Sequence, residues 1–285
     1  MTAVERVGVV GCGLMGSGIA EVCARAGVDV VVREIDQDAV AAGRARIEAS
    51  LARAHARGKV TGDELAAARG RLRFTTDLAD LADRELVLEA VTESEGLKLD
   101  VFATLDKVAA DGAILASNTS AIPIMKLAMA TGRPERVVGL HFFSPVPVLK
   151  LVELVSSLLT SEETAATVSD FAEHTLGKRV VRSKDRAGFI VNSLLIPYLV
   201  AAVRMVETGF ATAEDIDAGM VLGCNHPMGP LALTDFIGLD TTLAAAQSLY
   251  EEFKEPLYAP PPLLSRMVEA GLLGRKAGRG FYTYG

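Results

Sequence analysis

The chain has 285 residues, a length that corresponds to about 1.9 domains of ordinary size. Half of the residues are hydrophobic and 23% are charged, a composition that supports a sizeable core and excludes a largely disordered protein. With 29 basic and 36 acidic residues, the net charge of −7 argues against a general nucleic-acid binder. The three cysteines (Cys12, Cys23 and Cys224) exclude a disulfide scaffold and a zinc site, and they fit a reducing compartment.

No segment is long enough to be a membrane span. The longest uncharged apolar stretch covers residues 194–203 and ends at Arg204. The first six residues contain Glu5 and continue into a strand-like segment, which does not fit a signal peptide. We therefore expect a cytoplasmic protein without a membrane partner and without a metal site.

The first 185 residues alternate short β-rich runs with helical patterns, which is typical of βαβ units on a parallel sheet. In chain order the expected strands are 6–10, 28–33, 86–90, 114–117, 137–141, 151–155 and 178–182. The expected helices between them are 15–26, 38–56, 98–108 and 162–174, with Ser161 as an N-cap and Gly177 beyond the last turn. This order predicts a Rossmann-type, doubly wound α/β domain over residues 1–185.

The remaining residues, 186–285, contain helical patterns and no convincing strand, and we expect an all-α domain joined by the short segment 183–187. Helices are expected at 189–206, 213–221, 231–236, 239–253 and 262–269. The segment 189–206 is apolar on nearly every side, so it should pack against neighbouring helices or a partner subunit. We expect this domain to bind substrate and to form a homodimer.

A glycine-rich segment follows the first expected strand and begins a helix. Its sequence is Gly11-Cys12-Gly13-Leu14-Met15-Gly16. The first glycine allows a tight turn, the second lets a pyrophosphate approach the backbone, and the third allows close packing of helix on strand. The unpaired N–H groups of the helix N-terminus favour phosphate oxygens. These six residues are predicted to bind a dinucleotide.

An acidic residue at the end of the second expected strand indicates which dinucleotide binds. Glu34 lies 18 residues after Gly16, where a carboxylate accepts hydrogen bonds from the adenosine ribose. Because a carboxylate repels a ribose phosphate, NAD is favoured as the cofactor. The neighbouring Arg33 could serve a phosphate, so NADP is not excluded.

Polar residues also follow the later strands, at the edge where doubly wound sheets bind ligands. Ser117 ends one expected strand and His141 ends another. Glu153 lies inside the apolar run 151–155, where burial of a carboxylate is costly without a partner. A pair of His141 and Glu153 would form an oriented general base. A strand-end histidine and an edge-strand glutamate without catalytic roles are the alternative interpretation.

The sequence resembles the 3-hydroxyacyl-CoA dehydrogenase family in its short, single-function form, over essentially the whole chain. The resemblance rests on the glycine loop, the stretch from Ala116 to Ser120, the stretch from His141 to Glu153, and residues 188–192. It continues through Pro227-Met228-Gly229-Pro230 and Gly238-Leu239-Asp240 to Gly278-Arg279-Gly280-Phe281-Tyr282.

The resemblance implies roles for individual residues. His141 would be the general base that takes the proton of the substrate's 3-hydroxyl, and Glu153 would orient it. Ser117 and Asn192 would hydrogen-bond the reacting oxygen, in contact with substrate, and Ser117 would also contact the cofactor. The remaining implied cofactor contacts are Glu93, Lys98, Ser144 and Lys276. Ser144 departs from the asparagine that is usual in the family at that position.

Ser50 and Arg57 match family positions that contact coenzyme A, and the family often has lysine where Arg57 stands. The residues themselves give separate support, because Arg46, Ser50, Arg53 and Arg57 fall on one helix face. A basic stripe suits the phosphates of coenzyme A, although charged stripes are commonly only solvated.

The sequence thus predicts NAD-dependent interconversion of (3S)-3-hydroxyacyl-CoA and 3-oxoacyl-CoA, with 3-hydroxybutyryl-CoA as the expected substrate and a place in fatty acid metabolism. One alternative is the same chemistry on 3-hydroxyadipyl-CoA or another 3-hydroxy acid. Another, from a different functional class, is a non-catalytic NAD-binding protein. The intact set of His141, Glu153, Ser117 and Asn192 argues against a mere binding protein.

Overall fold

The structure is a computed structural model that describes residues 4–285. The expectation that the chain starts without a signal peptide rests partly on residues 1–3, which lie outside the described residues. The chain divides into two compact units, one ending at Asp185 and the other covering Arg186–Gly285.

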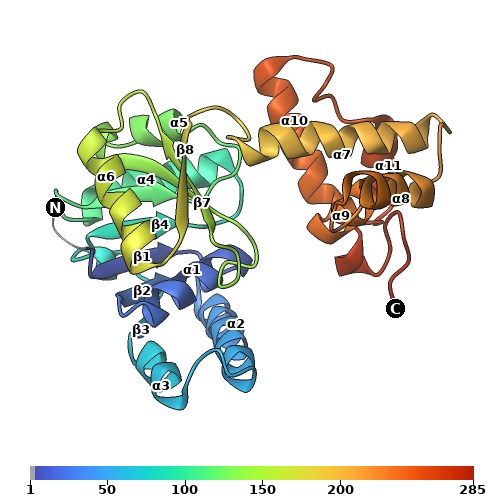
Figure 1. The fold of residues 1–285 in the computed structure, drawn as a ribbon. Coiled ribbons are helices and arrows are strands. Elements are labelled where there is room, and N and C mark those ends of the chain that lie inside the picture. Colours follow the sequence, from blue (N-terminus) through green and yellow to red (C-terminus); the bar gives the residue numbers. More distant parts are fainter. Residues whose placement is uncertain (1–3) are drawn as a thin grey trace. The chain divides into compact units, whose positions relative to one another are not determined.

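The first unit is built on one eight-stranded sheet with the strand order β3-β2-β1-β4-β5-β6-β7-β8 (Figure 1). All neighbouring strands are parallel except β6 and β7, which are antiparallel. The strands are β1 Arg6–Val10, β2 Asp29–Arg33, β3 Leu72–Thr75, β4 Leu86–Glu89, β5 Ile114–Ser117, β6 Val137–Phe142, β7 Leu151–Ser156 and β8 Arg179–Lys184. The predicted doubly wound sheet is therefore confirmed.

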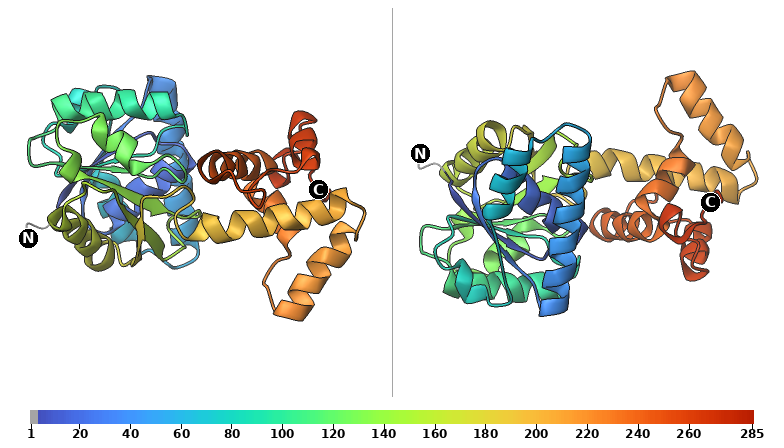
Figure 2. Two further views of the ribbon diagram at one scale, coloured as in Figure 1. Left: turned by 90° about the horizontal axis from the view of Figure 1, so that it is seen from above. Right: turned by 90° about the horizontal axis from the view of Figure 1, so that it is seen from below.

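Helices lie on both faces of this sheet (Figure 2). The helices of the first unit are α1 Leu14–Arg25, α2 Gln37–Ala56, α3 Gly62–Gly70, α4 Glu95–Val108, α5 Ile124–Met129 and α6 Glu162–Asp170, with a π-helical turn at Phe171–Thr175. The main core joins alternate strand residues to α1, α2 and α6, through side chains such as Ile19, Ile47 and Val168. On the opposite face, the Ile124 side chain of α5 packs against Gly139 of β6.

Several expected boundaries and omissions need correction. No strand or helix was expected between residues 57 and 85, yet this region contains α3 and β3. The capping box of Thr61 and Glu64 starts α3, and β3 is a four-residue edge strand that is only partly buried. The short helix α5 was also missed. The segment 183–187 was expected to be a linker, but hydrogen bonding to β7 continues β8 through Lys184, so its first two residues belong to the sheet.

Apart from a short 3-10 turn at Arg275–Ala277, the regular elements of the second unit are α-helices, as expected from the sequence. They are α7 Val191–Glu207, α8 Ala213–Cys224, α9 Pro230–Ile237, α10 Leu239–Phe253 and α11 Pro262–Glu269. Helix α7 begins two residues later than expected, because Gly188 and Phe189 have φ angles of +75° and +46°. Its buried side chains pack in two clusters that include Val200 and Val203.

The C-terminal segment is attached to the second unit by two buried carboxylates. Asp235 accepts hydrogen bonds from the backbone N–H groups of Phe281 and Tyr282, both at 2.9 Å, and from the hydroxyl of Tyr284. Asp217 accepts hydrogen bonds from two N–H groups at the start of α9 and from the Tyr282 hydroxyl. These hydrogen bonds give a structural role to Phe281 and Tyr282, the last two residues of the motif that begins at Gly278.

No helix within residues 4–285 is both long enough and apolar enough to span a membrane.

Candidate active site

The glycine loop connects β1 to α1, and its three glycines differ in the space that surrounds their Cα atoms. A Cβ atom on Gly16 would lie 1.8 Å from the carbonyl oxygen of Gly11, which forbids any larger residue there. Gly11 has a φ of +90°, and its Cβ would lie 2.8 Å from the Ala90 carbonyl oxygen. A Cβ on Gly13 would meet nothing within 4 Å, so this glycine faces open space.

Helix α1 begins without a side-chain cap and without an acidic residue in its first turn. Gly13 is the N-cap, and the next two residues, Leu14 and Met15, are exposed and partly exposed. Uncapped N–H groups with a partial positive charge suit an anion in place of a side chain. This arrangement fits a pyrophosphate group, as the sequence predicts.

Glu34 lies at the edge of the same loop. Its Oε1 accepts a hydrogen bond from the Cys12 N–H at 2.5 Å, and its Oε2 accepts one from the Ile35 N–H at 3.0 Å. The carboxylate is thereby fixed beside the loop, where it can accept further hydrogen bonds from a ribose. Burial raises the pKa of the Cys12 thiol to about 12, so Cys12 contributes its backbone rather than a reactive thiolate.

Four polar side chains at the carboxyl ends of β4 to β6 and on the facing strand β7 share one face of the sheet. In each of these strands, the residue next to the polar one belongs to the core that packs against α1, α2 and α6. Successive side chains of a strand point to opposite faces of the sheet. The four residues therefore point to the face that α5 covers; they are Glu89, Ser117, His141 and Glu153. Three of them were expected at the site, whereas Glu89 was missed.

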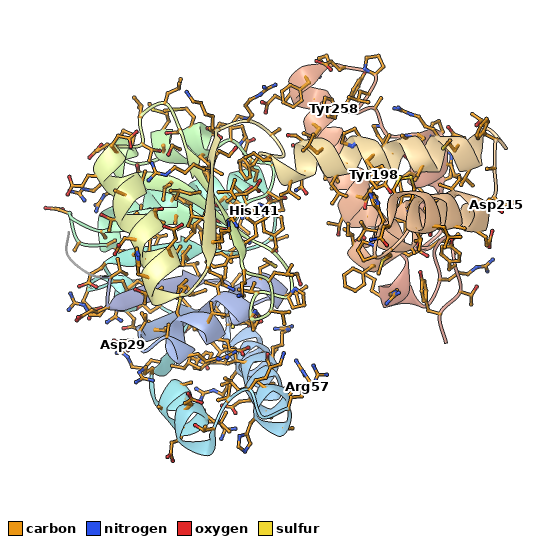
Figure 3. The ribbon with its side chains drawn as sticks, in the orientation of Figure 1. Asp29, Arg57, His141, Tyr198, Asp215 and Tyr258 are labelled. Atoms are coloured by element: carbon orange, nitrogen blue, oxygen red, sulfur yellow. The ribbon has the colours of Figure 1, made fainter. Side chains whose placement is uncertain are left out.

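His141 and Glu153 form a buried pair. They are direct register partners on the antiparallel strands β6 and β7, and Nδ1 of the histidine lies 2.8 Å from Oε2 of the glutamate. Glu153 is completely buried, and His141 is the labelled side chain beside the sheet in Figure 3. Because a carboxylate only accepts hydrogen bonds, Nδ1 carries the hydrogen and Nε2 carries the lone pair of the neutral ring. The expected pair of His141 and Glu153 is therefore present.

Ser117 is completely buried and participates in a network that the sequence did not indicate. Its Oγ donates to Glu89 Oε2 at 2.6 Å and accepts from the Thr119 N–H at 3.1 Å. Lys98 lies in the same network, 2.7 Å from Glu89 and 3.2 Å from Glu93. The expected contacts of Ser117, Glu93 and Lys98 with a ligand stay predictions.

Glu93 connects this network to the loop after β5. It accepts hydrogen bonds from the Thr119 hydroxyl at 2.6 Å and the Ser120 N–H at 2.9 Å. Burial favours a raised pKa for Glu93, but the charge of Lys98 and these hydrogen bonds lower it below its usual value. Glu93 therefore carries a negative charge at neutral pH.

The other expected site residues lie on different elements. Ser144 is exposed in the loop between β6 and β7. Ser50 is half-buried on α2, and Arg57 is exposed at its C-cap, where Figure 3 shows it extending away from the helix. In the second unit, Asn192 lies in the first turn of α7, and the Lys276 Nζ is 2.6 Å from Asp240. The last pair joins the turn at Arg275–Ala277 to the first turn of α10.

Comparison with known proteins gives matches to both units. A family model described as 3-hydroxyacyl-CoA dehydrogenase, NAD binding domain, matches residues 6–186. The C-terminal domain model of the same family matches residues 188–284. A 3-hydroxybutyryl-CoA dehydrogenase of Mycobacterium tuberculosis is 62% identical over 283 residues, which cover 99% of this chain and 99% of the relative.

Solved structures agree with these matches. The crystal structure of FadB2 from M. tuberculosis has a TM-score of 0.98 and 62% identity, with 100% of both chains covered. That of (S)-3-hydroxybutyryl-CoA dehydrogenase from Ralstonia eutropha has a TM-score of 0.95 and 46% identity, and covers 99% of this chain and 100% of the other. The chain is therefore an NAD-dependent oxidoreductase that belongs to the 3-hydroxyacyl-CoA dehydrogenase family.

Proposed function

We propose that this protein interconverts (3S)-3-hydroxyacyl-CoA and 3-oxoacyl-CoA, with 3-hydroxybutyryl-CoA as its substrate. The observation that carries the proposal is the buried pair of His141 and Glu153 at the strand edge of an NAD-binding domain. Similar proteins from M. tuberculosis and R. eutropha are described as 3-hydroxybutyryl-CoA dehydrogenases, which supports the short acyl chain.

His141 performs the proton transfer in this proposal. The Nε2 lone pair of the neutral ring takes the proton of the substrate's 3-hydroxyl, and the ring becomes an imidazolium. Glu153 keeps the hydrogen on Nδ1 and stabilises the positive charge that the ring acquires. NAD supplies the acceptor for the hydride that leaves carbon 3 of the substrate.

Positioning is divided among the remaining residues. The glycine loop and Glu34 hold the pyrophosphate and adenosine ribose, with Ser144, Glu93, Lys98 and Lys276 as further cofactor positions. Ser117 and Asn192 orient the reacting groups. Ser50 and Arg57 bind coenzyme A, and the exposed arginines of α2 provide cations for its phosphates.

We further propose that residues 186–285 form the substrate-binding and dimerisation domain of a cytoplasmic homodimer. Large apolar side chains of this unit are exposed in the single chain, including Leu194, Phe210, Leu222 and Phe236. Such exposure is costly in water and favours burial against a second copy.

The reaction is tested with acetoacetyl-CoA and NADH as substrates of the purified protein. The absorbance of the reduced cofactor should fall with time, and (3S)-3-hydroxybutyryl-CoA with NAD should give the reverse change. The enantiomeric (3R) substrate is the matched control and should not react. A protein that turns over no 3-oxoacyl-CoA with either NADH or NADPH would refute the proposed function.

A further inference from the structure

Two carboxylates share one ammonium group at the carboxyl ends of β4 and β5. Lys98 Nζ lies 2.7 Å from Glu89 Oε1 and 3.2 Å from Glu93 Oε2. Lys98 is 1% exposed and Glu89 is fully buried, whereas Glu93 is partly exposed. One positive charge therefore compensates only one of two negative charges, and the cluster of Glu89, Lys98 and Glu93 has a formal charge of −1.

The position of this charge is fixed by hydrogen bonds. Glu89 accepts from the Ser117 hydroxyl at 2.6 Å and from the Val91 N–H at 2.7 Å. Glu93 accepts from the hydroxyl of Thr119 and the N–H of Ser120. Because all these donors belong to two adjacent strand ends, neither carboxylate can turn away without leaving buried donors unpaired.

The cluster lies at the same edge as the proposed general base. Glu89 and Ser117 are register partners on β4 and β5, Ser117 and Gly139 are partners on β5 and β6, and His141 follows two residues later. With strands about 4.8 Å apart, these residues all lie within on the order of 12 Å. A hydride acceptor must bind beside the substrate carbon whose oxygen faces His141, and therefore at this edge.

We infer that the cluster of Glu89, Lys98 and Glu93 is the counter-charge for the oxidised nicotinamide ring and raises the affinity of this site for NAD relative to NADH. The inference rests on the proposed function, since that function places the ring at this edge. The ring is cationic in NAD and neutral in NADH, so a fixed negative charge stabilises only the oxidised form.

The acidic cluster and Glu153 then stabilise positive charge at different stages of the reaction. When the substrate is oxidised, its C–H bond gives a hydride to the ring, its O–H bond gives a proton to His141, and C–O becomes C=O. The positive charge thus moves from the ring to the imidazole. The cluster stabilises the charge before this step, and Glu153 stabilises it afterwards.

The inference is tested by measuring the dissociation constants of NAD and NADH, by calorimetry at fixed ionic strength, for the wild type and Glu89→Gln. The substitution removes the uncompensated charge, so the ratio of the NAD constant to the NADH constant should rise about tenfold. Glu21→Gln is the matched control, because Glu21 is an equally buried glutamate of the same unit, paired with Arg25. This control should leave the ratio unchanged.

Circular dichroism shows whether Glu89→Gln folds. If it does not fold, Glu93→Gln provides the decision, because it removes the excess charge and leaves the buried pair of Glu89 and Lys98 intact. A ratio within about twofold of the wild-type value in the folded variant, or an equal rise in Glu21→Gln, overturns the inference. Absence of turnover in the wild type refutes the proposed function instead, because the binding ratio is measured without acyl substrate.

Discussion

The histidine and glutamate of the proposed active site illustrate how one cross-strand contact can produce a chemical group that neither residue provides alone. A buried carboxylate without a partner would lose much of its hydration energy, and a solvent-exposed imidazole would not be fixed in one orientation. Placed opposite each other on β6 and β7, Glu153 satisfies its charge and His141 acquires a fixed tautomer. The burial of the pair and its proposed reactivity therefore have the same cause.

Substitution of His141 by alanine should lower kcat by about a hundredfold or more, since the proton acceptor is removed. Glu153→Gln retains a hydrogen-bonding side chain but no charge, and should lower kcat by about tenfold. Steady-state assays with acetoacetyl-CoA and NADH measure both effects. His174→Ala is the control, because that histidine is exposed and pairs only with Asp170 among the contacts of the described residues. Full activity of His141→Ala would exclude His141 as the base.

Glu34 is predicted to reject NADPH through the charge of its carboxylate. In Glu34→Ala, the repulsion of the 2′-phosphate disappears, and the Arg46 guanidinium, which donates to the Cys12 carbonyl at 3.1 Å, remains near the loop. The ratio of kcat/KM for NADPH to that for NADH should rise at least about tenfold. Glu48→Ala removes a partly exposed acid of α2 that pairs with Arg69, and it serves as control. An unchanged ratio would remove Glu34 from cofactor selection.

The site was only partly predictable at this scale, for a physical reason. His141 and Glu153 end or interrupt apolar runs, which is a local signal. Glu89 also ends an apolar strand, but its importance depends on Lys98 and Ser117, which come from a helix and another strand. The pairing of β4 with β5 and the position of α4 beside them bring these three residues together.

At the scale of elements, the regular parts of the fold were predictable where the apolar periodicity is strong. Helices α10 and α11 begin and end at the expected residues. The strand β3 escaped notice because an edge strand of four partly exposed residues has little hydrophobic pattern. Helix α3 has low amphipathicity, although its capping box was present in the sequence.

The basic stripe of α2 should raise the affinity of the protein for its acyl-CoA substrate. The double substitution Arg53→Glu and Arg57→Glu replaces two exposed cations by anions, so KM for acetoacetyl-CoA should rise about tenfold. The dissociation constant of NADH, measured by fluorescence titration, should change little. Arg69→Glu on α3 is the matched charge reversal outside the stripe. An unchanged KM in the double variant would favour a substrate without coenzyme A.

The attachment of the C-terminal segment depends on Asp235, which accepts three hydrogen bonds from that segment. Asp235→Ala leaves two partly buried N–H groups and a hydroxyl without their acceptor, and should lower the stability of the second unit by about 3 kcal/mol. The midpoint of thermal unfolding, followed by circular dichroism, measures this loss. Glu214→Ala, an exposed acid of α8, should unfold like the wild type. Equal midpoints for both variants would contradict this account of the segment.

At the scale of the whole molecule, the overall charge conceals an uneven distribution. The net charge of −7 disfavours a polyanionic partner, yet α2 presents exposed arginines suited to a small polyanion. One uncompensated carboxylate charge lies instead at the strand ends, in the cluster of Glu89, Lys98 and Glu93, where a cationic ring is expected. Composition therefore argues against whole classes of partner, whereas the proposed ligand contacts depend on where the fold places individual charges.

For the proposed homodimer, the exposed apolar side chains of the second unit predict where the interface lies. Leu194 of α7 is 71% exposed and Leu222 of α8 is 84% exposed. Burial of such a side chain against a second copy contributes about 1.5–3 kcal/mol, and a charge there would oppose it. The wild type should therefore sediment at micromolar concentration with twice the 30.0 kDa mass of the chain. Leu194→Glu with Leu222→Glu should shift it toward the monomer. Leu158→Glu, at a 93% exposed leucine of the first unit, should leave the dimer intact. A wild type that sediments as a 30.0 kDa species would refute the dimer, and a dimer lost equally in all variants would place its interface elsewhere.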